Sequence, residues 1–289
     1  MRTKDGIRIR FAHWRSGSNG TILFLNGRTE YVEKYGLAAS AFATRGFSFA
    51  TFDWRGQGLS ETVSHPPGIC HVDDFLDYQH DVKAVRSALS KLALPRPLFL
   101  VSHSMGGAIG LRALHEGLAV NAAVFCAPMW RIRFPPPAQF AARVLSAAAV
   151  RVGWSRRFVP GSGPSSHFEL ADSETNCLTS DAAIFSFLGG QLRLRPELSR
   201  GGPSCSWMHT AIRECHRLMS VRPPNLKSLV LLGTDERVVD PEAVRTLCAA
   251  WPEVELELIE GARHELLLES GELRQLVFDR TADFFLAYS

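Results

Sequence analysis

The sequence lacks the features that would assign it to a membrane-spanning, disulfide-stabilised or zinc-binding class of protein. No segment approaches the roughly 20 consecutive apolar residues of a membrane span. The first residues, MRTKDGIRIRFAHW, alternate charged with apolar side chains and do not lead into an apolar run. The 6 cysteines form no CxxC pair and no Cys/His ligand spacing, and a chain of this size needs no disulfides to fold. We therefore expect a cytoplasmic protein with free thiols and no structural zinc.

An excess of charge of one sign is also missing. The 289 residues include 32 Lys and Arg against 29 Asp and Glu, which gives a formal net charge of +3. Because nucleic-acid-binding proteins depend on a strongly basic surface, this balance favours a small or neutral ligand. The hydrophobic content of 46% is ample for a large buried core. Nothing in the composition specifies an oligomeric state.

Short apolar segments rich in β-forming residues alternate with longer amphipathic ones. Between residues 75 and 92, apolar side chains recur every three or four positions, which predicts a helix of about five turns. Two segments of alternating polarity, 7–14 and 254–260, fit outer strands. The segments that fit buried parallel strands are 21–26, 46–53, 97–103, 122–128 and 226–233. The pattern predicts an α/β fold with a doubly wound, mostly parallel sheet.

This alternation stops between residues 129 and 222. A triple proline at 135–137, an Ala-rich stretch and turns rich in Gly, Ser and Pro replace it. We interpret the segment as a helical cap inserted into a core formed by residues 1–128 and 223–289. Such a cap would cover the carboxyl ends of the strands, where open α/β sheets bind their ligands.

The clearest motif lies where the predicted strand at 97–103 runs into the small-residue sequence SMGGAIG, which begins at Ser104. A serine at such a strand-to-helix turn is exposed for attack only if the residues two before and two after it are small. These positions are Ser102 and Gly106. The motif therefore predicts Ser104 as a nucleophile, the alternative being an ordinary glycine-rich turn.

The motif SHSMGG resembles the GHSMGG nucleophile elbow of α/β hydrolases, particularly the branch of bacterial lysophospholipases and monoacylglycerol lipases. The segments NGRTEYVEKY, DWRGQGLS and RGGPSCSW resemble other parts of that branch, so the resemblance covers nearly the whole chain. Ser102 and Asn26 stand where the family usually has glycine and histidine, which would alter turn geometry without removing a catalytic group. The resemblance implies the α/β-hydrolase fold and a serine hydrolase that needs no cofactor and no metal.

In α/β hydrolases the chain order is serine, acid, histidine. His264, in GARHE after the last predicted strand, is the only histidine in the last quarter of the chain and is the expected base. Asp235 follows the strand predicted at 226–233 and is the expected acid. Asp240 is the alternative, although the following proline suits it to capping a helix. We expect Glu236 to face solvent or to support the triad from outside.

Two backbone amides are the expected oxyanion donors: that of Met105, at the start of the helix, and that of Arg28, on the strength of the family match. Two nearby side chains are ambiguous. Glu30 could brace the turn that contains Arg28 or be a surface carboxylate. His103 is expected to pack or hydrogen-bond behind the elbow.

The front of the predicted cap is basic and apolar. Between residues 129 and 160 it has no acidic residue and six arginines: Arg131, Arg133, Arg143, Arg151, Arg156 and Arg157. Such an edge could make transient contact with an anionic membrane surface, so that the protein is peripheral to it, or could be a solvated helix face.

The expected function is hydrolysis of a carboxylic ester through an acyl-serine intermediate. The resemblance implies a lysophospholipase or monoacylglycerol lipase with an ester or lipid as substrate. A general short-chain esterase or thioesterase is the alternative within enzymes. A non-catalytic ligand-binding protein is the alternative outside them, since a fold does not determine a function.

Overall fold

The computed structural model describes residues 1–62, 68–171 and 175–289. Its described part contains a seven-stranded sheet in the order β1-β3-β2-β4-β5-β6-β7. The strands are β1 (Phe11–Trp14), β2 (Thr21–Leu25), β3 (Ser48–Phe52), β4 (Leu98–His103), β5 (Ala123–Cys126), β6 (Ser228–Gly233) and β7 (Val254–Ile259). Neighbouring strands are parallel except β1, which runs antiparallel to β3. The predicted fold class is confirmed.

The burial of the central strands explains why the sequence pattern predicted them. Strands β2 to β6 are buried along their whole length, whereas β1 and β7 lie at the edges and are partly exposed. The outer strand expected at 7–14 is shorter than predicted. Its first residues pair instead with the start of the chain, where the Ile9 amide donates to the carbonyl of Met1 and Arg8 bridges to Arg2.

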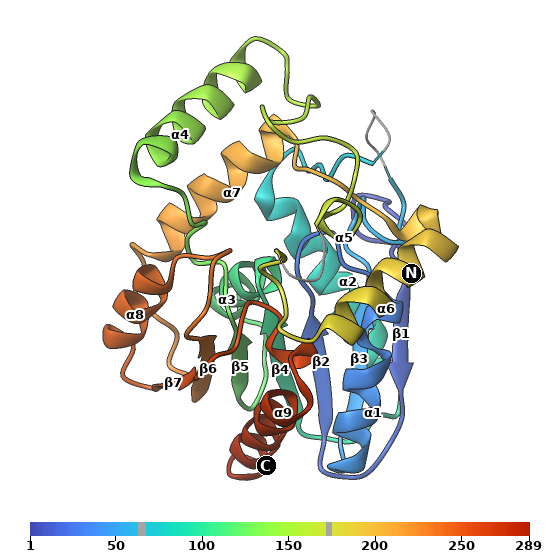
Figure 1. Cartoon of the computed structure of the whole chain (residues 1–289). Helices are drawn as coiled ribbons and strands as arrows, with labels where there is room; N and C mark the ends of the chain where they lie inside the picture. Colours follow the sequence, from blue (N-terminus) through green and yellow to red (C-terminus); the bar gives the residue numbers. More distant parts are fainter. Residues whose placement is uncertain (63–67, 172–174) are drawn as a thin grey trace.

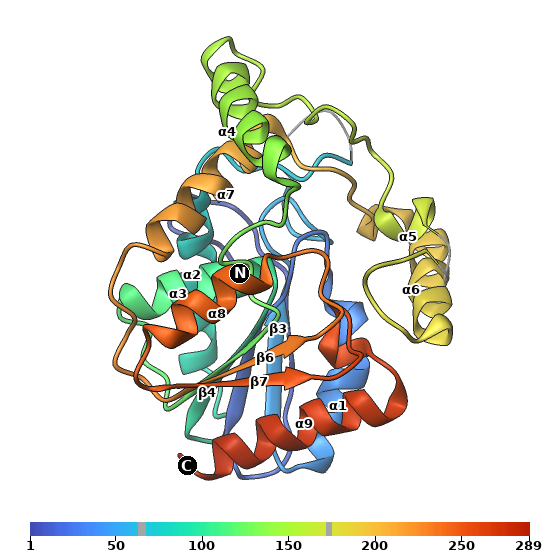
Figure 2. The same ribbon diagram turned by 60° about the vertical axis from the view of Figure 1, so that its left-hand side comes forward.

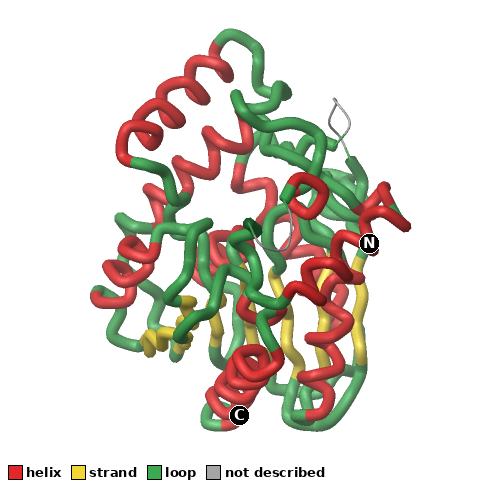
Figure 3. The backbone as a smooth tube through the Cα atoms, in the orientation of Figure 1, coloured by secondary structure: helices red, strands yellow, loops and turns green. Residues whose placement is uncertain are grey.

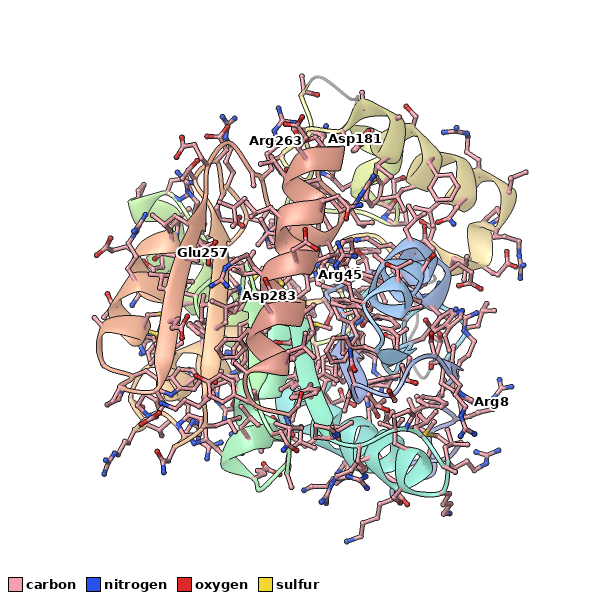
Figure 4. All side chains as sticks on the ribbon, turned by 90° about the horizontal axis from the view of Figure 1, so that it is seen from below. Arg8, Arg45, Asp181, Glu257, Arg263 and Asp283 are labelled. Carbon is pink, nitrogen blue, oxygen red and sulfur yellow. The ribbon has the colours of Figure 1, made fainter. Side chains whose placement is uncertain are left out.

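Helices cover both faces of the sheet. On one face α1 (Gly36–Thr44) and α9 (Gly271–Leu286) pack together, with the rings of Phe42 and Phe278 5.0 Å apart. Figure 4 shows this face from below, with Arg45 at the end of α1; its guanidinium lies 2.7 Å from Asp279 of α9. On the other face lie α2 (Tyr78–Ser90), α3 (Met105–His115) and α8 (Pro241–Ala249). The helix predicted from residue 75 begins as the short 3-10 turn η2 (Phe75–Asp77) and continues as α2.

The helices between β5 and β6 gather at one end of the sheet. They are α4 (Pro136–Arg151), α5 (His167–Leu170), α6 (Ala182–Leu194), η3 (Pro196–Leu198) and α7 (Cys205–Leu218). Figures 1 and 2 show them above the sheet, with the C-terminus at the opposite end, and Figure 3 shows the strands confined to the lower half. In the part of the chain that the structure describes, no helix combines the length and apolarity needed to cross a bilayer.

Helix α7 is fastened to the core at its first turn. Ser204 caps the helix by accepting a hydrogen bond from the Trp207 amide at 3.0 Å. The same hydroxyl lies 2.8 Å from Nδ1 of His71, and the Ser204 amide donates to the carbonyl of Cys70. The segment between β5 and β6 is therefore anchored where it meets the loop that precedes α2.

Candidate active site

Ser104 occupies the turn between β4 and α3 in an unusual backbone conformation. Its φ is 51° and its ψ is −119°, a combination that non-glycine residues rarely adopt and that marks strained functional positions. A side chain at Gly106 would place a Cβ atom 2.1 Å from the carbonyl oxygen of Leu25. The residue two after Ser104 must therefore be glycine, as the turn requires. Ser102 is buried in β4, and its hydroxyl has a partner in the carbonyl oxygen of Val124 on β5, 3.5 Å away.

His264 joins Ser104 to a buried carboxylate. Its Nε2 lies 2.9 Å from Oγ of Ser104, and its Nδ1 lies 2.7 Å from Oε2 of Glu236. The three residues are 8%, 3% and 2% exposed for Ser104, His264 and Glu236 respectively. They come from the turns that follow β4, β6 and β7, which end at the same edge of the sheet. The arrangement is a continuous hydrogen-bonded relay from serine through histidine to carboxylate.

The predicted partner of His264 was wrong by one residue. Asp235 is exposed, and its backbone amide donates to the carbonyl of Ala262 at 3.0 Å, which pins it to the turn while its side chain faces solvent. The next side chain, Glu236, consequently points into the protein, and its extra methylene lets it span the distance to His264. Asp240 caps α8 by accepting from the amides of Glu242 and Ala243, as its sequence pattern indicated.

The Glu236 carboxylate is held in its ionised form. Burial tends to raise its pKa, but the neighbouring His264 and two backbone hydrogen bonds lower the pKa below its ordinary value of 4.5. These bonds come from the amides of Val238 and Val239 to Oε1, at 2.6 and 3.0 Å. The carboxylate can therefore accept a hydrogen bond from Nδ1–H of His264, which leaves Nε2 without a proton and facing Ser104.

The two backbone amides that the sequence predicted as oxyanion donors are those of Met105 and Arg28. The Met105 amide is the first of α3, where helix N–H groups have no partner within the helix and carry a partial positive charge. The amides of Gly27 and Thr29 donate to the side chains of Glu30 and Gln57. Within the described residues the Arg28 amide between them has no hydrogen-bond partner, so it is available to a ligand.

Side chains hold the Arg28 turn on both sides. Asn26, which replaces the family's histidine, donates from Nδ2 to the carbonyl of Phe52 at 2.8 Å, and its own carbonyl accepts from the Trp54 indole at 2.9 Å. The Arg28 guanidinium donates to the carbonyl of Gly201 at 2.9 Å and lies 5.5 Å from the ring centroid of Trp207. The turn is thereby fixed to β3 below it and to the α7 region above it.

The His264 loop is tied to the segment that precedes α6. The Glu265 amide donates to the carbonyl of Leu178 at 2.8 Å. The Arg263 guanidinium donates to the carbonyls of Asn176 and Thr179 at 3.0 and 2.9 Å. Figure 4 shows Arg263 and Asp181 at the same edge of the molecule. The loop that positions His264 is thus supported from outside the sheet.

An apolar groove lies beside α4 and α7. Its volume is about 690 Å³, and its wall includes side chains of both helices and of the loop between residues 152 and 160. Met208, which lines the groove, immediately follows Trp207, the residue beneath the Arg28 guanidinium. The groove is therefore lined by the same helix, α7, whose Trp207 contacts Arg28.

One group of side chains has the spacing of a metal site. In the described residues, ligand atoms of Glu30, His103 and Glu265 lie within 4.8 Å of one another. The ammonium of Lys34 already lies between the two carboxylates, 2.5 Å from Glu30 and 2.6 Å from Glu265. These two carboxylates therefore already share a cation that the chain itself supplies. The six cysteines are all free thiols, as predicted.

The chain is similar to a family of hydrolases and to two proteins named as lysophospholipases. The family described as serine aminopeptidase, S33, matches residues 16–271. The chain is 27% identical over 286 residues to a probable lysophospholipase L2 of Haemophilus influenzae, covering 97% of this chain and 89% of that protein. It is 28% identical over 295 residues to lysophospholipase L2 of Escherichia coli, covering 97% of this chain and 85% of that protein.

A solved structure shares the fold across the whole chain. A soluble variant of monoglyceride lipase from Saccharomyces cerevisiae, in complex with a substrate analog, superposes with a TM-score of 0.78 at 20% identity. The superposition covers 99% of this chain and 93% of that one. With its family match over residues 16–271 and its parallel sheet, the chain belongs to the serine aminopeptidase S33 family and is a serine hydrolase of the α/β-hydrolase fold.

Proposed function

We propose that the chain hydrolyses carboxylic esters of lipids with Ser104 as nucleophile, His264 as base and Glu236 as the acid that orients it. The observation that carries the proposal is the relay at 2.9 and 2.7 Å through the two nitrogens of His264. A serine hydroxyl becomes an effective nucleophile when an adjacent base removes its proton during attack. Glu236 would hold the ring in the tautomer that accepts this proton and stabilise the imidazolium that forms.

The steps follow from this geometry. Ser104 Oγ would bond to the ester carbonyl carbon as its proton moves to Nε2 of His264. The amides of Met105 and Arg28 would stabilise the tetrahedral oxyanion. His264 would then protonate the leaving alcohol as the carbon–oxygen bond breaks, leaving an acyl-Ser104 intermediate. Water, activated by the same histidine, would release the acid and restore the serine.

Two observations support a lysophospholipid or monoacylglycerol as the substrate. The relatives are named lysophospholipase L2, and the structural neighbour is a monoglyceride lipase. The groove beside α4 and α7 is walled mainly by apolar side chains, which suit an acyl chain. We propose that residues 129–222 act as the cap that selects the substrate.

We further propose that exposed side chains of α4 and of the turn that follows it make transient contact with an anionic lipid surface. Large apolar side chains are exposed in this segment: Phe140 (74%) and Leu145 (57%) on α4, and Val152 (63%) and Trp154 (50%) just after it. They are interspersed with arginines, and the guanidinium of Arg157 lies 4.7 Å from the ring centroid of Trp154. Apolar side chains beside basic ones are the composition of a helix that lies at a membrane interface. Such contact would make a cytoplasmic protein peripheral to the membrane.

A fluorophosphonate probe and a substrate panel test the chemistry. The probe should label the wild type and not Ser104→Ala. The panel should contain monoacylglycerols, lysophospholipids, short nitrophenyl esters, thioesters and an aminoacyl nitroanilide. Turnover of the two lipid classes at the highest kcat/KM supports the proposal. If the probe does not label the wild type, the serine mechanism is contradicted. A preference for short esters, thioesters or the anilide would contradict the assignment of a lipid substrate.

Sedimentation with phosphatidylglycerol vesicles tests the membrane contact. The double variant Phe140→Ser/Trp154→Ser should sediment less than the wild type. Leu286→Ser, at the exposed end of α9 on the far side of the molecule, is the matched control and should sediment as the wild type does. Equal sedimentation of all three proteins would contradict the proposal.

A further inference from the structure

Four buried ionisable side chains form a cluster beneath the candidate active site. They are Glu30, Lys34, His103 and Glu265, and the Lys34 side chain is only 2% exposed. The Lys34 ammonium donates to Oε1 of Glu30 at 2.5 Å and to Oε1 of Glu265 at 2.6 Å. Nε2 of His103 lies 3.5 Å from Glu265 and 3.7 Å from Glu30. Lys34 is thus the direct link between two carboxylates that are 235 residues apart along the chain (265 minus 30).

Each carboxylate lies next to a different part of the catalytic apparatus. Oε2 of Glu30 accepts hydrogen bonds from the amide of Gly27, the residue before Arg28, and from the Tyr35 hydroxyl. Glu265 directly follows His264. The cluster therefore connects the turn that presents the Arg28 amide to the loop that presents the His264 ring.

The cluster also lies against the back of the relay. His103 directly precedes Ser104, and its ring centroid is 4.7 Å from that of His264. Its Nδ1 lies 3.2 Å from the carbonyl oxygen of Cys126, so the ring is held between β5 and the cluster. Packing behind the elbow is what the sequence predicted for His103.

Attraction between opposite charges keeps Lys34 and Glu265 ionised although both are buried. Burial alone would lower the pKa of Lys34 and raise that of Glu265. The two carboxylates instead raise the pKa of Lys34, and the charges of Lys34 and His103 hold the pKa of Glu265 well below its ordinary value. Buried charges of this kind are costly to leave unpaired, so removing one member strands the others.

We propose that Lys34 is a positioning residue of the reaction: its ammonium binds Glu30 and Glu265 together and so sets the separation between the oxyanion turn and the His264 loop. The proposal rests on the function proposed above. Lys34 itself touches neither Ser104 nor His264 in the described contacts. Its effect on the reaction passes through Glu30 to the Gly27 amide and through Glu265 to the neighbouring histidine.

The central experiment compares Lys34→Met with a matched control. Arg112 is also a buried cation with two carboxylate partners, Glu116 at 2.8 Å and Glu214 at 3.1 Å, but it lies in the last turns of α3. Lys34→Met should lower kcat for a monoacylglycerol about 10- to 100-fold, because small misplacements of catalytic groups cost this much, with KM nearly unchanged. Arg112→Met should lower the Tm without a comparable loss of kcat.

A double variant separates positioning from stability. Lys34→Met/Glu265→Gln removes one of the two carboxylate charges that the single variant strands and leaves Glu30 beside His103, so it should recover part of the lost Tm. It does not rebuild the link between the two loops, so kcat should remain low. If the single variant fails to fold, the double variant alone decides. Recovery of kcat along with the Tm would overturn the proposal, as would wild-type kcat in folded Lys34→Met.

A tetrahedral inhibitor gives a second readout. An alkyl trifluoromethyl ketone forms an oxyanion adduct with a catalytic serine, whereas the corresponding alkyl alcohol only occupies the substrate site. Lys34→Met should weaken inhibition by the ketone about as much as it lowers kcat and should leave inhibition by the alcohol unchanged. Equal weakening of both inhibitors would contradict positioning. Ser104→Ala serves as the reference for the proposed function: if it retains full activity, the function fails independently of Lys34.

Discussion

Exchanging Glu236 for glutamine should nearly abolish turnover while leaving the fold intact. The amide oxygen of glutamine can take the place of Oε1 and keep the hydrogen bonds from Val238 and Val239, at 2.6 and 3.0 Å. Its NH₂ group would then face Nδ1 of His264 in place of Oε2, at about the present 2.7 Å. An NH₂ group donates, so Nδ1 would have to accept and the ring proton would move to Nε2.

This tautomer cannot accept the Ser104 proton, because its Nε2 already carries one. The same exchange in a serine protease triad costs about 10⁴-fold in kcat, which corresponds to about 5 kcal/mol in the activation barrier. We expect a loss of this size in Glu236→Gln, measured as kcat and kcat/KM on a monoacylglycerol or nitrophenyl ester. Circular dichroism and the Tm should stay close to those of the wild type.

Asp235→Asn is the control for this prediction. Its side chain is exposed and makes no contact with His264 in the described structure, so activity should remain within about twofold, as is usual for surface changes. A severe loss in Asp235→Asn together with near-normal turnover in Glu236→Gln would refute the assignment of Glu236.

Three further predictions concern Gly106, His71 and two buried cysteines. Gly106→Ala should lower the free energy of unfolding by about 3 kcal/mol in a urea titration, because the added Cβ would lie 2.1 Å from a backbone oxygen. Burial lowers the pKa of His71 below its ordinary 6.5, more than the nearby Asp73 raises it. The neutral ring therefore favours the folded state above pH 6.5, and this contribution is lost as the pH falls toward the lowered pKa; the Tm should fall more steeply with acidification in the wild type than in His71→Gln. Burial raises the pKa of Cys126 and Cys215 to about 12, so iodoacetamide should modify neither thiol in the native protein and both in urea, as read by peptide mass spectrometry.

Each of these has a contrary outcome. Wild-type stability in Gly106→Ala would mean that the elbow has more room than the contact allows. Parallel Tm curves for the wild type and His71→Gln would remove His71 as a source of acid sensitivity. Rapid alkylation of the native protein at Cys126 or Cys215 would contradict their burial.

The sheet and the turn that carries Ser104 could be predicted from the sequence because both depend on short, local patterns. A parallel strand that is buried on both faces must be apolar along its length, and β2 to β6 all lie within segments read in this way. The elbow requires small residues two before and two after the serine, and the structure shows why at Gly106. His264 was identified because chain order left no other histidine, and the structure brings its Nε2 to within 2.9 Å of Ser104.

The partner of His264 depended on tertiary structure. Asp235 and Glu236 are adjacent carboxylates after the same strand, and nothing local distinguishes which one faces inward. The backbone hydrogen bond from Asp235 to Ala262 decides the orientation, and that contact joins the turns after β6 and β7, which come together only when the two strands pair. The amides of Val238 and Val239 then complete the pocket around Glu236.

The pairing of charges in the buried cluster of Glu30, Lys34, His103 and Glu265 could not be predicted from the sequence pattern. The sequence left open whether Glu30 supports the turn that contains Arg28 or lies at the surface. Lys34 and Glu265 belong to residue types that are usually exposed. They are buried because folding brings a turn near residue 30 against a loop near residue 265, where each charge finds its counterpart within 2.6 Å. The sequence by itself determined the strands, the turn at Ser104 and the position of His264 after the last strand. Tertiary structure decided which charges are paired, because pairing depends on distances between segments that no local pattern encodes.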